Sequence, residues 1–71
     1  MKNKLGLRKE IYSIYFIEQA ISDYRHICTV DIENTNDYYI CAIKNAVTDL
    51  QLIMNEFEDY LIGLIGKNEF V

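Results

Sequence analysis

Residues 28–44 read CTVDIENTNDYYICAIK, and this stretch predicts an antiparallel β-hairpin. Residues 28–33 alternate between apolar and polar side chains, which is typical of a strand buried on one face. Residues 34–37 are Asn-Thr-Asn-Asp, and short Asn and Asp side chains favour turns because they hydrogen-bond to nearby backbone. Residues 38–44 are again rich in β-forming side chains, so the turn joins two strands.

The spacing of apolar residues predicts a helix before this hairpin, over about residues 14–26. Ser13 is suited to be its N-cap, because a hydroxyl can accept a hydrogen bond from a free N–H group of the first turn. Apolar side chains then recur at steps of three and four residues, which places them on one side of a helix. These side chains are Ile14, Ile17, Ile21, Tyr24 and Cys28.

A further strand is predicted near the start of the chain, over residues 5–12. Successive residues of a strand point to opposite faces of the sheet. One face of this strand would carry Leu5, Leu7 and Ile11, and the other would carry Arg8, Glu10 and Tyr12.

The last predicted element is a helix over about residues 49–65. Thr48 and Gln51 have the spacing of a capping box, and Asp49 adds negative charge at the helix start. Gly66 is expected to end the helix, because glycine readily adopts the left-handed conformation found after helix ends. The apolar residues fall within an arc of about 140° on a helical wheel. They are Leu50, Ile53, Met54, Phe57, Tyr60, Leu61, Leu64 and Ile65.

The order strand, helix, strand, strand, helix predicts a single α+β domain over residues 1–71. We expect a three-stranded antiparallel sheet with the strand order 1-3-2 and both helices on one face. This arrangement resembles a ferredoxin-like fold that lacks its last strand. The two helices are expected to pack on the sheet through five apolar residues. These residues are Ile17, Ile21, Phe57, Leu61 and Leu64.

Composition and charge argue against several classes of partner. The chain of 71 residues has a net charge of −4, with only seven scattered Lys and Arg residues. Nucleic acids and anionic membranes are therefore not expected as partners, because both are bound mainly through clustered positive charge. No apolar run approaches the roughly 20 residues of a membrane-spanning helix, and residues 1–10 lack the apolar core of a signal peptide.

These features favour a cytoplasmic location, where cysteines stay reduced. We therefore expect Cys28 and Cys41 to be small buried thiols, since free cysteine is among the most buried residue types. A disulfide is the alternative, because the two cysteines could lie on adjacent strands.

The residues needed for a catalytic, cofactor or metal site are not found together in the sequence. His26 is the single histidine and has no companion ligands at a spacing typical of zinc. Glu56, Glu58 and Asp59 could serve in acid–base chemistry, but they lie on the polar side of the predicted last helix. We therefore expect no catalytic residues, no cofactor and no enzymatic activity.

The predicted strand 38–44 has apolar side chains on both faces, which normally indicates that both faces are covered. Two helices can cover only one face of a three-stranded sheet. The other face would carry Tyr38, Ile40 and Ala42, with Tyr12 on a neighbouring strand, and an apolar stripe with a polar rim often marks an interaction site. An ordinary mixed surface is the alternative, since single exposed apolar residues are common.

In length and element order the chain resembles the small accessory proteins of the His-Xaa-Ser peptide maturation system, the HxsD-like family. Tyr12-Ser13 matches the Tyr-Ser step into their first helix. Asp59-Tyr60 matches their C-terminal signature Leu-Leu-Asn-Asp-Tyr-x-Leu-Arg-Glu, although Ile62 and Gly63 stand where Leu-Arg is expected. The resemblance implies a non-enzymatic partner of radical-SAM enzymes that modify ribosomally made peptides.

The sequence thus leaves two functions open. One is an accessory module that binds a peptide or protein through the open sheet face or a strand edge. The other is a self-associating structural protein in which the same surface forms a symmetric homodimer.

Overall fold

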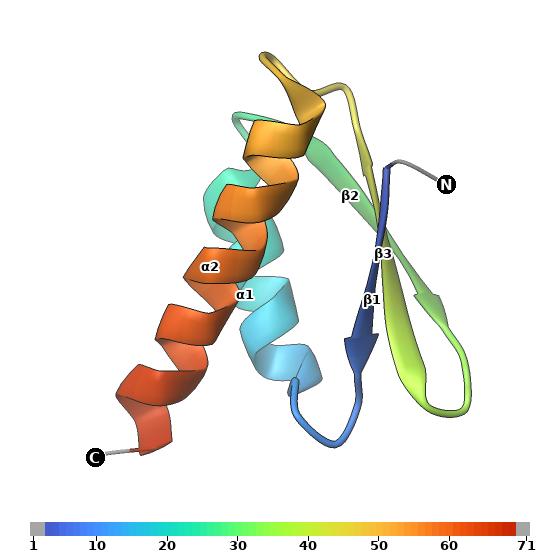
Figure 1. The fold of residues 1–71 in the computed structure, drawn as a ribbon, viewed down its shortest axis with the longest axis vertical. Coiled ribbons are helices and arrows are strands. Elements are labelled where there is room, and N and C mark those ends of the chain that lie inside the picture. The colour runs from blue at the N-terminus through green and yellow to red at the C-terminus, as the bar shows by residue number, and fades with distance from the viewer. Residues whose placement is uncertain (1–2, 70–71) are drawn as a thin grey trace.

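The computed structural model describes residues 3–69, in the order strand, helix, strand, strand, helix (Figure 1). The predicted α+β fold is confirmed, including the antiparallel sheet with the order β1-β3-β2. The elements are β1 (Lys4–Arg8), α1 (Ile14–Tyr24), β2 (Thr29–Asn34), β3 (Tyr38–Lys44) and α2 (Leu50–Glu69).

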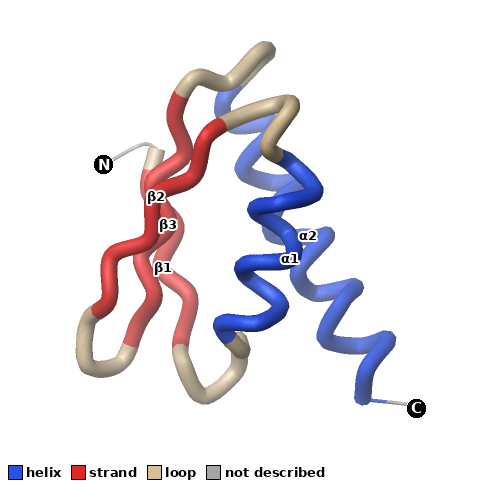
Figure 2. Tube along the Cα trace, turned by 180° about the vertical axis from the view of Figure 1, so that it is seen from behind, coloured by secondary structure: helices blue, strands red, loops and turns tan. Residues whose placement is uncertain are grey.

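The sheet and the helices form two layers (Figure 2). Strand β3 lies in the centre, and its pairing sets the register of both neighbours. Ala42 is opposite Lys4 of β1 and Asp31 of β2, while Ile40 is opposite Gly6 and Glu33. The hairpin predicted from residues 28–44 is therefore present, and its loop is closed by the N–H of Thr35, which donates to the Tyr38 carbonyl at 2.9 Å.

Helix α1 begins as predicted at a Ser13 N-cap. The Ser13 hydroxyl accepts a hydrogen bond from the N–H of Tyr15 at 3.2 Å, and its carbonyl accepts from Phe16 and Ile17. The helix ends at Tyr24, two residues earlier than predicted, because the Tyr24 carbonyl accepts the N–H groups of Ile27 and Cys28 in a turn towards β2.

Strand β1 is shorter than its apolar pattern predicted, ending at Arg8 rather than at residue 12. Its partner β3 begins at Tyr38, which is opposite Arg8, and the last ladder bond runs from the N–H of Lys9 to the Asp37 carbonyl. Beyond that point the chain has no strand to pair with. The N–H groups of Ile11 and Tyr12 both donate to the Arg8 carbonyl instead, forming a turn.

Helix α2 is longer than predicted and continues through Gly66 to Glu69. The glycines of the described residues all have negative φ, so Gly66 does not adopt the left-handed conformation that would stop the helix. The predicted capping box is also wrong. The helix starts at Leu50 with the Asp49 carbonyl accepting from Ile53, and Gln51 Nε2 donates to Asn55 Oδ1 within the helix.

The core lies between the sheet and the two helices, as the periodicity of both helices predicted. Ile17, Phe57 and Leu61 are fully buried, while Ile21 and Leu64 are half-buried against them. The Phe57 ring meets Tyr24 edge to face, with 5.5 Å between ring centroids. The other buried side chains are Leu7, Ala20, Cys28, Cys41, Ile43, Ile53 and Met54.

Candidate functional site

The sheet face that points away from both helices is the candidate site, and we call it the open face. Side chains alternate along each strand, so its members are the residues between those that enter the core. Cys41 and Ile43 of β3 and Leu7 of β1 are buried on the helix side. The open face therefore consists of Lys4, Gly6, Arg8, Thr29, Asp31, Glu33, Tyr38, Ile40, Ala42 and Lys44.

Apolar side chains run along the centre of the open face, on β3. Tyr38 is 38% exposed, and Ile40 and Ala42 are half-buried by their neighbours. Gly6 of β1 adds to this surface, because a Cβ at that position would lie 3.6 Å from Tyr38 Cδ1 and 3.7 Å from Ile40 Cδ1. The Tyr38 and Ile40 side chains thus extend over the glycine and widen the apolar strip.

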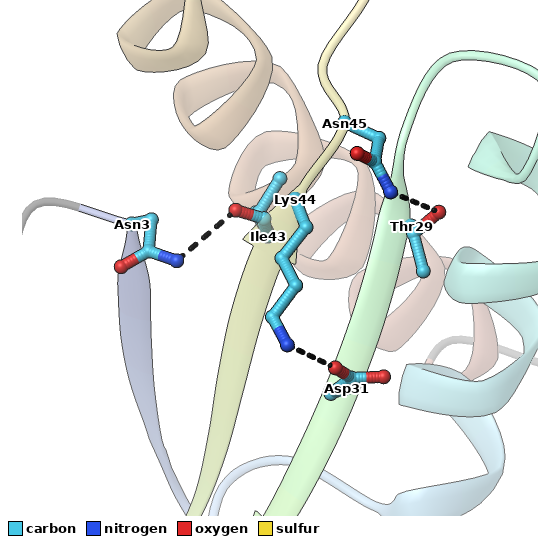
Figure 3. Close-up of polar contacts among 6 residues, drawn as sticks. All are labelled: Asn3, Thr29, Asp31, Ile43, Lys44 and Asn45. Carbon is cyan, nitrogen blue, oxygen red and sulfur yellow. Dashed lines mark hydrogen bonds and ion pairs between the residues drawn. The ribbon is translucent and has the colours of Figure 1, made fainter.

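Charged side chains flank this strip on both edge strands. Lys4 and Arg8 belong to β1, whereas Asp31 and Glu33 belong to β2. Lys44 Nζ lies 2.7 Å from Asp31 Oδ2 and ties β3 to β2 across the face (Figure 3). An open hollow of about 330 Å³ lies beside these groups. It is lined by Asn3, Lys4, Asp31, Ile32, Glu33, Ile40, Ala42 and Lys44.

Tyr12, which was predicted to belong to this surface, lies elsewhere in the structure. Because β1 ends at Arg8, the following turn carries Tyr12 to the helix side, where it is half-buried against the core. Burial and the nearby Glu58 carboxylate of α2 raise the pKa of the Tyr12 hydroxyl. Glu10, predicted on the same rim, lies in this turn and pairs with Arg8.

Two residues of the open face were not recognised as candidates from the sequence. These residues are Lys4 and Gly6, both on β1. Their importance depends on register, since only the pairing of β1 with β3 places Lys4 opposite Ala42 and Gly6 opposite Ile40. The alternation with Leu5 and Leu7 indicated on which face Lys4 and Gly6 lie, but it did not indicate which β3 residues lie beside them.

The other polar residues considered from the sequence lie outside the open face. His26 is exposed in the turn after α1, and Glu56 and Asp59 are exposed on α2. The Tyr60 hydroxyl donates to Asp23 Oδ2 and joins the two helices. This hydrogen bond and a second one from Gln19 lower the pKa of the Asp23 carboxyl.

No three His, Cys, Asp or Glu side chains come together in a metal-binding arrangement anywhere in residues 3–69. Within the same range, neither helix is long and apolar enough to cross a membrane.

Both cysteines are free thiols buried on the helix side of the sheet. Cys41 is opposite Ile32 of β2, whereas Cys28 comes just before β2 and four residues before Ile32, a displacement of about 13 Å. A disulfide requires Cα atoms within about 7 Å, so the two cannot pair inside one chain without rearrangement. Burial raises the pKa of Cys28, and it raises the pKa of Cys41 to about 11.

These thiols are expected to react slowly with Ellman's reagent at pH 8. The thiolate is the reactive form, and Cys41 is both inaccessible and protonated at that pH. Reaction then requires opening of the fold, so native labelling of a Cys28→Ala variant should be about 1,000-fold slower than labelling in guanidinium. Equal rates in the two conditions would show that Cys41 is accessible in the native protein.

Comparisons of the chain with protein-family models, with curated proteins and with solved structures gave no match.

Proposed function

We propose that this chain is a non-catalytic accessory module that binds a peptide or protein through its open face. The observation that carries the proposal is the apolar strip of Tyr38, Ile40 and Ala42 on the sheet face without helices. A central strand with two apolar faces is normally covered on both. A binding partner supplies the second cover.

The composition of the open face supports this role. Its centre is apolar and includes a tyrosine, a residue type enriched at protein interfaces, while its rim carries charged side chains. This distribution is typical of an interface core surrounded by a solvated rim. The hollow of about 330 Å³ between Ile40, Lys4 and Glu33 offers space for a partner's side chain.

The resemblance to the His-Xaa-Ser accessory proteins suggests which kind of partner would bind. In that context the partner is a radical-SAM maturation enzyme or its ribosomally made precursor peptide. The alternative is a homodimeric structural protein, which the same apolar strip would also serve.

Photo-crosslinking in the native host tests the proposed binding face. Replacing Tyr38 with p-benzoylphenylalanine keeps an aromatic ring at an exposed position, so the fold should be retained. Irradiation is expected to give a discrete adduct, whose mass and peptides identify the molecule seated on the face. An adduct of twice the 8.4 kDa chain mass would identify a second copy.

Leu52 provides the matched control, because it is 49% exposed on α2 and lies outside the open face. The same photo-reactive residue at position 52 should give no such adduct. Equal adducts from both positions, or none from position 38, would contradict the proposed role of the open face.

A further inference from the structure

Apart from Lys44 of the central strand, which is paired with Asp31, the charges of the open face are divided by sign between its two edge strands. Strand β1 contributes Lys4 and Arg8, and strand β2 contributes Asp31 and Glu33. We propose that this face binds a second copy of the same chain, with the two sheets related by a twofold axis parallel to β3. The inference rests on the proposed binding role of the open face and, of the partners considered for it, selects a second copy of the chain.

Symmetry explains why the division of charge favours this partner. A twofold axis parallel to the strands, lying between two facing sheets, places β3 over β3 and β1 of each copy over β2 of the other. Lys44 at the end of β3 then lies over Lys44 of the second copy, where each is neutralised by its own Asp31. Lys4 and Arg8 of one copy then face Asp31 and Glu33 of the second copy, at both flanks. An axis across the strands would instead place β1 over β1, so that cations face cations.

The register brings the complementary groups to matching heights along the strands. Lys4 and Asp31 are both opposite Ala42, so in the proposed dimer each Lys4 lies above Asp31 of the other copy. Glu33 lies two residues beyond Asp31, which is about 7 Å further along β2. Facing sheets lie about 10 Å apart, a gap that a lysine and a carboxylate side chain reaching from opposite sides can span.

Two of these charges lack a partner in the single chain. Within residues 3–69, the exposed side chains of Lys4 and Glu33 make neither an ion pair nor a hydrogen bond. Asp31 is already paired with Lys44, and Arg8 with Glu10. Each single chain therefore presents one unpaired cation and one unpaired anion on opposite flanks of the apolar strip. The proposed axis places each Lys4 above Asp31 of the second copy, with the unpaired Glu33 about 7 Å further along the same strand.

The size of the face determines how tight such a dimer can be. Three strands at about 4.8 Å spacing and five residues at about 3.4 Å give a contact of roughly 14 by 17 Å. That area is below the standard size of stable interfaces, and small interfaces are typical of weak complexes. We therefore expect a reversible dimer that dissociates on dilution and weakens with added salt, because part of its attraction is electrostatic.

Charge reversal tests both the dimer and its axis. Sedimentation equilibrium of the purified chain should detect a monomer–dimer equilibrium. Lys4→Glu and Glu33→Lys, made separately, should each raise the dissociation constant about tenfold, since each creates like-charge contacts at both flanks. The double variant, Lys4→Glu with Glu33→Lys, should recover part of the lost affinity, because the exchanged charges attract across both flanks while Asp31 still faces position 4. An equimolar mixture of the two single variants should form a heterodimer.

Both positions are exposed, so circular dichroism should show all three variants folded. A chain that is monomeric at millimolar concentration would overturn the inference. A double variant no better than the single ones would overturn the proposed axis and so the inference as stated. In either case, an adduct from position 38 to a different protein would leave the proposed function intact. A monomeric chain that also gives no adduct would contradict both.

Discussion

Replacing Phe57 with alanine is expected to lower the free energy of unfolding by about 3–5 kcal/mol, the usual cost of truncating a buried aromatic residue. Phe57 is fully buried at the centre of the core and contacts Tyr24 edge to face. A domain of this size has a total stability of about 4–11 kcal/mol, so the variant should lose a large part of it. Urea denaturation followed by circular dichroism measures the change.

Leu52→Ala is the matched control for this experiment. Leu52 lies on the same helix but is 49% exposed, so its truncation should change the free energy of unfolding by less than about 0.5 kcal/mol. The contrast between the two variants isolates burial from helix propensity. If Phe57→Ala were as stable as Leu52→Ala, helix α2 would not pack against the sheet through Phe57.

A second large effect is expected when a lysine is placed on the helix side of β3, but the fold should survive a lysine on the open face. Ile43 is 1% exposed on the helix side, and Ile43→Lys would bury a charge without a partner. That penalty is several kcal/mol, comparable with the whole stability of the domain, so the variant should be largely unfolded at 25 °C. Ile40→Lys places the same charge on the open face, where the side chain can reach water, and should remain folded.

Thermal denaturation measures whether each lysine variant is folded, and sedimentation measures its association. Folded Ile40→Lys should show weaker association than the parent chain, because the charge would be desolvated in an interface. An unfolded Ile40→Lys monomer would mean that the open face needs its apolar surface even in the single chain. Unchanged association would contradict its role as a binding face.

The architecture could be predicted from the sequence because the apolar residues of each helix and strand recur with the spacing typical of that element. Alternation marked residues 28–33, steps of three and four marked Ile17, Ile21 and Leu61, and the Asn-rich turn joined β2 to β3. Element ends were less predictable where they depended on distant parts of the chain. Strand β1 ends at Arg8 because β3 begins at Tyr38, and this limit is invisible in the apolar pattern of residues 5–12.

The same distinction applies to the candidate site, where local alternation could be interpreted from the sequence but pairing between distant strands could not. Tyr38, Ile40 and Ala42 could be assigned to the open face because alternation along β3 puts them on the same side as the charged Lys44. Tyr12 was assigned wrongly because its face depended on where β1 ended. Lys4 and Gly6 could not be recognised as neighbours of Ala42 and Ile40, because register between strands far apart in sequence is set by tertiary pairing.

The central position of β3 has a consequence for the order in which the molecule assembles. Asn34 pairs with Tyr39 across a short turn, whereas Lys4 pairs with Ala42 from the far end of the chain. Closing the longer loop costs more chain entropy, so the β2–β3 hairpin is expected to form before β1 joins it. The late strand is the one that contributes Lys4, Gly6 and Arg8 to the open face. A partner seated on that face would therefore stabilise the last step of folding, because the whole surface exists only once β1 has joined the β2–β3 hairpin.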